Sequence, residues 1–457
     1  HPSSPTGPAM SQELTGWSRT APTRATVVSP TTPEALAATL ADVGDRGVIA
    51  RGLGRSYGDA AQNAGGAVAD ATGVRRLLAF DGVTGLVTAE SGLSLDALLR
   101  VVVPQGWFVP VSPGTRHVTV GGAIAADVHG KNHHRDGSFV QHVRSLRLRT
   151  PAGVVEVGPD EDPDLFWATA GGMGLTGVIL DATFALQPIT SSRLLVDTER
   201  TADLDDALDR MTRGDHGYHY SVAWIDLVAT GATMGRSVLT RGDFAPVDAL
   251  SEGDRGNPLA YDPSVLVTAP PWVPNLALNR LSVRAFNEFW YRKHPRHRTG
   301  ELQAIPSFFH PLDLVEGWNR IYGSRGFLQW QMVVPFGAEA TLRRAVEALS
   351  GEGRPSFLAV LKRFGESDPG PLSFPMAGWT LALDIPAGDA TLGPLLDRLD
   401  RDVAEAGGRI YLAKDSRLDP ALLATMYPRL DEWREIRARV DPDQALQSDL
   451  ARRLDLL

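Results

Sequence analysis

The segment of residues 114–132 constrains the fold of this chain more than any other part of the sequence. Its first part, residues 118–126, is small and mostly apolar, and it carries the paired glycines Gly121 and Gly122. Glycine lets a backbone approach a flat or anionic group closely, because it has no Cβ. A run of charged, amide and imidazole side chains follows at once in residues 127–134. The pattern favours a buried wall with a reactive edge, and a small-residue strand before a solvated loop is the alternative.

Composition narrows the possible classes of protein. At 457 residues the chain is too long for one ordinary core, so two domains are expected, and the apolar fraction of 43% is typical of a globular protein. The net charge of -9 argues against nucleic-acid binding, which needs a basic surface. The absence of cysteine excludes disulfides, thiolate metal sites and cysteine nucleophiles. We predict no metal site.

The chain divides into consecutive regions that differ in composition and pattern. Residues 1–13 resemble a flexible leader without the layout of a signal peptide, and no apolar run reaches the roughly 18 residues of a membrane span. We expect a first domain in residues 14–192 and a second in residues 193–409. A C-terminal segment, residues 410–457, returns to the first domain. Residues 244–300 are proline-rich and form a long irregular region that we expect to be mobile.

Lysine is scarce in this chain, with four lysines among 45 basic residues. In a chain biased toward arginine, lysine persists mainly where a compact ammonium with an adjustable pKa is needed. Lys131, Lys362 and Lys414 are therefore candidates for chemistry, with chance survival as the alternative. Lys293 lies in a basic run and is expected at the surface.

Two glycine-rich loops stand in the first domain. Residues 51–59 read Arg-Gly-Leu-Gly-Arg-Ser-Tyr-Gly-Asp and follow a short buried strand. Backbone N–H groups in such a turn point inward and bind phosphate, although the spacing differs from the Rossmann fingerprint. A plain tight turn is the alternative. Residues 171–177 form the second glycine loop.

The second domain alternates strands with amphipathic helices. Gln329 and Gln331 share one face of a predicted strand and are suited to bind sugar hydroxyls, with solvent exposure as the alternative. Trp224 lies in another predicted strand. The aromatic residues of residues 244–300 indicate contact with a lipid or a partner, unless that region folds onto its own core.

Several motifs together resemble one family. They are Arg-Gly-Leu-Gly-Arg-Ser-Tyr-Gly-Asp (51–59), Val-Gly-Gly-Ala-Ile (120–124), His-Gly-Lys-Asn-His-His (129–134), Leu-Phe-Trp-Ala-Thr (165–169) and Tyr-Leu-Ala-Lys-Asp-Ser-Arg (411–417). With them the chain resembles flavoproteins of the vanillyl-alcohol oxidase superfamily over residues 14–457. The resemblance implies an α+β fold with a PCMH-type FAD-binding domain and a mixed-sheet substrate domain.

The resemblance also implies FAD as the cofactor. Relatives with covalent flavin have a histidine just before the serine of the first loop, where this chain has Arg55, so we expect non-covalent FAD. The implied cofactor-binding residues are Ala50, Arg51, Gly52, Leu53, Gly54, Arg55, Ser56, Tyr57, Gly58, Asp59, Gly114, Thr115, Thr119, Val120, Gly121, Gly122, Asp127, Val128, His129, Ile179 and Tyr411.

The branch of the superfamily that this chain resembles oxidises the 2′-hydroxyl of a decaprenyl-phosphate-linked ribose to a 2′-keto sugar. That reaction is the first half of an epimerisation that makes the arabinose donor for cell-wall arabinan. The implied partners are an NAD(P)H-dependent keto-reductase, a quinone-type electron acceptor and the membrane surface of the cell envelope. The resemblance leaves the side of the membrane open, with the periplasmic face as one candidate.

Roles for single residues follow from the resemblance. Lys414 is expected beside the flavin and the reacting hydroxyl, where a cation stabilises a developing alkoxide or the reduced flavin. Tyr57 and His129 are further candidates for proton handling, and the identity of the base stays open. The expected substrate-binding residues are Lys131, Trp224, Gln329, Gln331, Lys362 and Lys414.

Two other functions compete with this interpretation. One is an alditol or aldonolactone oxidase of the same fold, against which Arg55 and the apolar residues of 272–291 count. The other is a prenyl-lipid binding module with a vestigial flavin site, against which the three lysines count.

Overall fold

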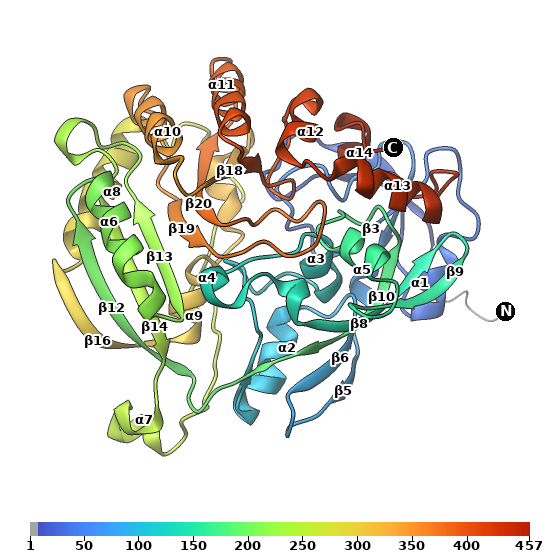
Figure 1. The fold of residues 1–457 in the computed structure, drawn as a ribbon, viewed down its shortest axis with the longest axis horizontal. Coiled ribbons are helices and arrows are strands. Elements are labelled where there is room, and N and C mark those ends of the chain that lie inside the picture. Colours follow the sequence, from blue (N-terminus) through green and yellow to red (C-terminus); the bar gives the residue numbers. More distant parts are fainter. Residues whose placement is uncertain (1–7) are drawn as a thin grey trace.

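The computed structural model describes residues 8–457, and residues 1–7 lie outside the described range. Its two parts meet along their length, with the first part on the right of Figure 1 and an eight-stranded sheet on the left. The observed mixture of helices and sheets agrees with the predicted two-part α+β class.

The first part contains two main sheets. The four-stranded sheet has the order β1 (Met10–Leu14), β2 (Thr23–Val28), β4 (Ala67–Asp70), β3 (Val48–Arg51). The five-stranded sheet has the order β5 (Leu77–Phe80), β6 (Leu86–Glu90), β10 (Val178–Ala185), β8 (Val143–Thr150), β9 (Gly153–Val157). Strand β1 pairs with β2, so the prediction of a flexible leader is wrong from Met10 onward.

Short helices connect these strands, and four of the five begin with a capping side chain. They are α1 (Pro33–Ala38), α2 (Leu95–Val102), α3 (Val120–Ala125), α4 (His133–Asp136) and α5 (Pro163–Thr169). The cap of α1 is Thr32, whose hydroxyl accepts from the backbone N–H of Ala35.

The small-residue segment after residue 118 is a helix and not a strand. Helix α3 begins after Thr119, whose hydroxyl accepts from the N–H of Gly122 at 3.1 Å. The helix packs against β6 and β10. A Cβ added to Gly121 would lie 3.0 Å from the Cβ of Ser91, so the close packing of α3 on its neighbour requires a residue this small.

The second part is built on an eight-stranded sheet. Its order is β16 (His297–Ala304), β12 (Arg193–Thr201), β14 (Ser237–Phe244), β13 (Tyr220–Ile225), β19 (Ala359–Phe364), β20 (Gly378–Pro386), β18 (Phe327–Pro335), β21 (Arg409–Ile410). Its strand pairs within the described residues are antiparallel, so the predicted mixed sheet is not found here. The parallel pairs lie instead in the four-stranded sheet.

One face of this sheet is covered by helices and the other is turned toward the first part. Helices α6 (Leu204–Gly214), α10 (Glu339–Gly351) and α11 (Leu392–Glu405) pack on the covered face, and Figure 1 shows α10 and α11 at its upper edge. The opposite face carries the side chains of the site described below.

Residues 244–300 contain more regular structure than expected. They include α7 (Glu252–Arg255), β15 (Val267–Thr268), which pairs with β17 (Val315–Glu316), and the long helix α8 (Arg280–Lys293). The prediction of an irregular segment is wrong for α8. The side chain of Asn279 caps this helix by accepting from the N–H groups of Leu281 and Ser282, so Asn279 is the local signal for its start.

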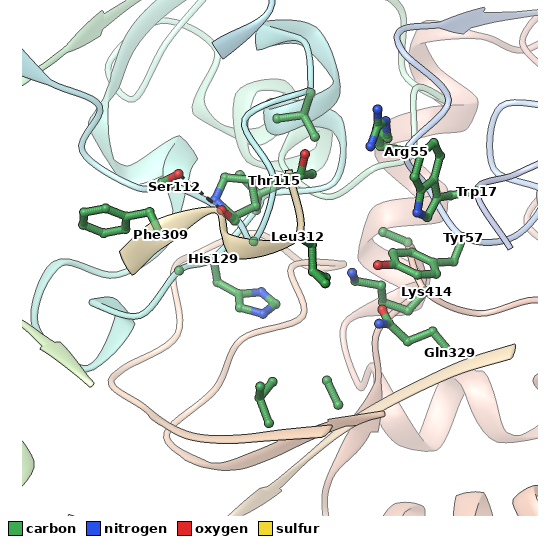
Figure 2. A pocket seen from close by; sticks show the side chains of 18 of the residues that line it. Trp17, Arg55, Tyr57, Ser112, Thr115, His129, Phe309, Leu312, Gln329 and Lys414 are labelled. Carbon is green, nitrogen blue, oxygen red and sulfur yellow. Dashed lines mark hydrogen bonds between the residues drawn. The ribbon is translucent and has the colours of Figure 1, made fainter. Parts of the chain in front are cut away.

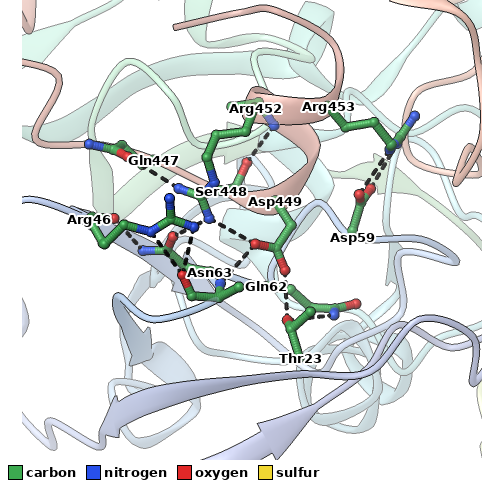
Figure 3. Close-up of polar contacts among 12 residues, drawn as sticks. Thr23, Arg46, Asp59, Gln62, Asn63, Gln447, Ser448, Asp449, Arg452 and Arg453 are labelled. Atoms are coloured by element: carbon green, nitrogen blue, oxygen red, sulfur yellow. Dashed lines mark hydrogen bonds and ion pairs between the residues drawn. The ribbon is translucent and has the colours of Figure 1, made fainter.

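The C-terminal segment packs against the first part. It contains α12 (Leu423–Met426), α13 (Leu430–Val440) and α14 (Asp449–Arg453), and Pro428 lies in the break between α12 and α13. Figure 3 shows the contacts of α14: the Asp449 carboxylate accepts from the Thr23 hydroxyl at 2.6 Å, and Arg453 pairs with Asp59 at 2.8 Å.

The other short elements complete the chain. They are β7 (Trp107–Phe108), which pairs with β11 (Gln187–Pro188), and α9 (Ile305–Phe309). Within residues 8–457, no helix combines the length and the apolar character that a membrane span requires.

Candidate active site

A cavity of about 1050 Å³ lies between the two parts of the molecule. It is lined by the first glycine loop, by α3 and the residues after it, and by the uncovered face of the eight-stranded sheet. Ligand pockets usually measure roughly 300 to 1,000 Å³. The cavity therefore has room for a large ligand or for two ligands together.

Most of the predicted site residues line this cavity. They are Ala50, Arg51, Gly52, Leu53, Gly54, Arg55, Ser56, Tyr57, Gly114, Thr115, Thr119, Gly121, Gly122, Val128, His129, Lys131, Ile179, Trp224, Gln329, Gln331, Lys362, Tyr411 and Lys414. Figure 2 shows Tyr57, Lys414 and Gln329 next to one another, with His129 facing them across the cavity. Lys293 is exposed, as expected, and lies at the outer rim.

Four predicted residues lie behind the wall. A Cβ on Gly58 would lie 2.0 Å from the carbonyl oxygen of Asp415, so this glycine permits close packing of two backbones. The Asp59 carboxylate is occupied by Arg453, and the Val120 side chain is buried in the core. The fourth, Asp127, supports the wall from behind.

Asp127 belongs to a buried pair of carboxyl groups. The Ser138 hydroxyl lies 2.9 Å from Asp127 Oδ2 and 2.7 Å from Asp368 Oδ2, and the Ser373 hydroxyl contacts the same two groups. Burial and the nearby Asp368 raise the pKa of Asp127 well above its usual range. The pair therefore fixes the loop around Ser373 behind His129.

The glycine loop and α3 form a surface suited to an anionic, flat ligand. A Cβ on Gly52 would lie 2.4 Å from Thr119 Oγ1, so the loop runs directly against the start of α3. The buried Ser91 hydroxyl on the cavity wall and the buried Arg55 Nε have no protein partner among the described residues. The Arg55 guanidinium stacks on Trp17 at 3.7 Å (Figure 2). Unpaired polar groups beside a glycine-lined wall fit the pyrophosphate of a dinucleotide.

Arg51 has a different task from the one expected. Its guanidinium donates to the carbonyl oxygens of Ala61 and Thr15, at 3.0 and 2.8 Å. Those bonds hold the loop in shape, so Arg51 contributes to the wall mainly through its position.

Asp384 is a site residue that the sequence analysis missed. It is buried on β20, where it accepts from Gln329 Nε2 at 2.6 Å and from the Tyr322 hydroxyl at 3.5 Å. Burial raises the pKa of Asp384 to about 7. A carboxylate within an otherwise apolar strand was the available signal, because unpaired charges are rarely buried without a function.

The three singled-out lysines meet at this cavity from distant parts of the chain. Burial lowers the pKa of Lys362 to about 8. Burial, with the neighbouring Lys362, lowers the pKa of Lys131 to about 7. Lys131 Nζ donates to the carbonyl of Phe308 and lies 4.6 Å from its ring centroid.

Lys414 lies closest to the residues of the glycine loop. Its Nζ is 3.9 Å from the ring centroid of Tyr57. Burial lowers the pKa of Lys414 to about 7, while the charge of Asp384 acts in the opposite direction. Burial and Asp384 raise the pKa of the Tyr57 phenol well above 10, so that phenol stays protonated.

The hydrogen bonds around His129 determine its tautomer. The Thr380 hydroxyl donates to the carbonyl of Met332 at 2.8 Å and therefore accepts from Gln331 Nε2 at 3.1 Å. The same amide group lies 3.0 Å from His129 Nε2, so Nε2 accepts and the ring proton is on Nδ1. Nδ1 is buried without a protein partner among residues 8–457. Burial, with Lys362 nearby, keeps the pKa of His129 well below its usual range, so the ring is a neutral donor.

Comparison with known proteins identifies the family. A family model described as "FAD binding domain" matches residues 24–158, and a model described as "D-arabinono-1,4-lactone oxidase" matches residues 389–454. Decaprenylphosphoryl-β-D-ribose oxidase from Mycolicibacterium smegmatis is 46% identical over 458 residues, which cover 98% of this chain and 99% of that protein. This chain belongs to the decaprenylphosphoryl-β-D-ribose oxidase family. It is an FAD-dependent oxidoreductase, as predicted.

More distant similarity extends beyond this oxidase family. An L-gulono-1,4-lactone dehydrogenase from Mycobacterium tuberculosis is 25% identical over 441 residues, covering 94% of this chain and 95% of that protein. A Streptomyces coelicolor protein without a described function is 43% identical over 373 residues. Membership of the oxidase family excludes the alternative of a prenyl-lipid binding module without catalytic activity. Within residues 8–457, no group of His, Asp and Glu has the arrangement of a metal site.

Proposed function

We propose that this chain oxidises the 2′-hydroxyl of decaprenylphosphoryl-β-D-ribose to the 2′-keto sugar. One observation carries the proposal: lysines from all three regions of the chain and two glutamines of the second part meet the glycine loop of the first part in one cavity. The name of the relative with 46% identity supports the same substrate.

The glycine loop, Ser91 and Thr119 would hold the FAD. When bound, FAD accepts the hydride that leaves the carbon of the reacting alcohol. Arg55 occupies the position of the linking histidine in covalent relatives, and its cationic guanidinium is a poor nucleophile. Non-covalent binding follows from that difference.

The sugar and the phosphate would be held by different side chains. Lys131 and Lys362 are buried ammonium groups, and a phosphate between them would favour their charged forms. Gln329 Oε1 is buried without a protein partner among the described residues, so it is free to accept from a sugar hydroxyl. Gln331 is committed to His129 and Thr380 and acts as a support.

Lys414 is the group best suited to take the hydroxyl proton. Its pKa of about 7 lies near the expected working pH, where a general base is most effective. The adjacent Asp384 stabilises the ammonium that forms. Tyr57 stays protonated and His129 is a donor, so neither accepts that proton. The resulting cation also fulfils the electrostatic role expected for Lys414.

Replacing Asp384 by asparagine should move the acid limb of the pH profile to lower pH. The active form of a base is unprotonated, so kcat/KM rises with pH through the pKa of Lys414, about 7. Asp384 raises that pKa, and its removal lowers it. The measurement is kcat/KM against pH for both proteins, with the exposed Asp160→Asn as a control that keeps the native limb. A limb that stays in place or moves upward would contradict the role of Lys414 as base.

The chemistry also defines the partners. The 2′-keto sugar requires an NAD(P)H-dependent reductase to deliver hydride to the opposite face, which completes an epimerisation and yields the arabinose donor for cell-wall arabinan. The electrons require an acceptor, which we propose to be a quinone. Both reactions would occur at the cell envelope, because the substrate carries a decaprenyl chain.

Exposed apolar residues support contact with a membrane surface. Trp272, Leu276 and Leu281 have 76%, 77% and 77% of their surface exposed, and Phe289 has 62%. Arginines of α8 lie among them, and such a mixture binds anionic lipid surfaces. We expect the protein to float with anionic lipid vesicles and the double variant Leu281→Ser/Phe289→Ser to do so at least about threefold less.

A matched variant controls that vesicle experiment. Val83 is 88% exposed in a different part of the molecule, so Val83→Ser should float as the unaltered protein does. Equal flotation of the Leu281/Phe289 variant and the Val83 variant would remove the proposed contact.

The central experiment is an anaerobic visible spectrum of the FAD-loaded protein. Farnesylphosphoryl-β-D-ribose should bleach the flavin band, and L-gulono-1,4-lactone should leave it unchanged. Bleaching by the lactone alone would favour the aldonolactone oxidase, whose family model matches residues 389–454. A band that neither compound bleaches would overturn the proposal.

A further inference from the structure

The side chains on the uncovered face of the eight-stranded sheet change from polar to apolar across the sheet. A row of cross-strand neighbours begins at Gln331 on β18 and continues through Ala382, Val360, Trp224 and Val238. All five side chains line the cavity. Gln331 is the only amide of the row, and it contacts His129. The other four side chains are apolar.

The row leads away from the glycine loop across five adjacent strands. Neighbouring strands lie about 4.8 Å apart, so four intervals span roughly 19 Å. A second row, Thr198, Thr240 and Val222, lies beside the first and also lines the cavity. This arm of the cavity is therefore long, and its floor on the sheet is mostly apolar.

Helix α8 covers the arm from the opposite side. Phe286 and Trp290 line the cavity, and the Phe286 ring packs edge-on against Phe357 at 5.3 Å. Polar contacts attach the helix to the sheet: Asn287 Nδ2 donates to Asp226 at 2.8 Å, and the Tyr291 hydroxyl donates to the Thr201 carbonyl at 3.0 Å. The apolar roof is thus held by one buried and one partly buried hydrogen bond on its flank.

The far end of the arm opens at the molecular surface. The exposed residues Lys293 and Arg298 belong to its lining. They follow the exposed apolar residues of α8 in the chain. A ligand that fills the arm can therefore continue beyond the protein at this rim.

We propose that this arm binds the first isoprene units of the polyprenyl chain, between the sheet and α8. The inference rests on the proposed function, because the sugar and phosphate must occupy the polar end near Gln331 and Lys362. A mostly apolar arm of this length fits a flexible isoprenoid, and water or a polar ligand would find few partners there. The arm makes the enzyme select its substrate by the lipid as well as by the sugar.

Comparison of two chain lengths tests the proposal. The substrates are dimethylallylphosphoryl- and farnesylphosphoryl-β-D-ribose, and the readout is kcat/KM of the FAD-loaded full chain. The farnesyl compound should be preferred by at least about tenfold, since buried apolar groups give discrimination of that order. Thr240→Trp places a large ring in the arm and should reduce the preference to near one.

Two further variants complete the design. Thr233→Trp makes the same change at an exposed position outside the cavity and should keep the native preference. Phe286→Ala removes part of the roof, is available if Thr240→Trp fails to fold, and should reduce the preference at least about threefold. Bound FAD, read from the visible spectrum, reports whether each variant is folded.

The outcomes separate this inference from the function on which it rests. Oxidation of neither compound by the unaltered protein would overturn the proposed function. Equal oxidation of both compounds, or a farnesyl preference that survives in Thr240→Trp and Phe286→Ala, would overturn the proposed arm and leave the function in place.

Discussion

Replacing Lys414 by methionine should lower kcat by about 10²- to 10³-fold, the loss typical of removing one preorganised polar group from a reacting oxygen. Methionine keeps the length and apolar stem of lysine, so packing against Tyr57 is largely preserved, whereas the proton acceptor and the resulting cation are lost. The measurement is the rate of anaerobic flavin bleaching at saturating farnesylphosphoryl-β-D-ribose.

A second lysine gives the contrast for that experiment. Lys362→Met should act mainly on KM, because we assign this ammonium to the phosphate and not to the reacting hydroxyl. Both variants should retain the visible spectrum of bound FAD. A kcat for Lys414→Met within about threefold of the native value would rule out its role in proton transfer.

Replacing Gly52 by valine should weaken FAD binding by about 100-fold. The new Cβ would lie 2.4 Å from Thr119 Oγ1, which itself caps α3. Relief of the clash requires the loop to move away from the helix, and overpacking of this kind costs about 3 kcal/mol. That strain corresponds to a rise of about 100-fold in the dissociation constant of FAD.

The readout is the ratio of flavin to protein absorbance after purification, followed by titration with FAD. Gly44→Val provides the control, because Gly44 is exposed and a Cβ added there would have no heavy atom within 4 Å. The control should purify with native FAD content. Native flavin content in Gly52→Val would show that the loop does not contact the cofactor.

Much of the site could be predicted from the sequence because its signals are local or compositional. The glycines of residues 51–59 indicate a close backbone approach wherever they occur. The scarcity of lysine singled out Lys131, Lys362 and Lys414 without knowledge of the fold, and all three side chains line one cavity. The alternation of Gln329 and Gln331 placed both on one strand face, and both line that cavity.

Other features depend on partners that are distant in the sequence. In the sequence, Asp384 is a single carboxylate in an apolar strand. Only the pairing of β18 with β20 places Gln329 opposite it, where the two side chains form a hydrogen bond. The role of His129 as a donor follows from Thr380 and Gln331, which approach it from two other strands. The glycine-paired segment was recognised as a buried wall, but the cap by Thr119 and the packing on β10 make it a helix.

The sequence by itself determined the family resemblance, because its motifs are local, and that resemblance implied the flavin chemistry and many of the residues that line the cavity. The tertiary structure decided which of those residues act on one another. It placed Asp384 where its charge acts on Lys414, fixed the proton on His129, and aligned apolar residues of neighbouring strands beneath α8. The physical reason is that pKa values, tautomers and cavities arise from burial and cross-strand register, which bring together residues that no local pattern connects.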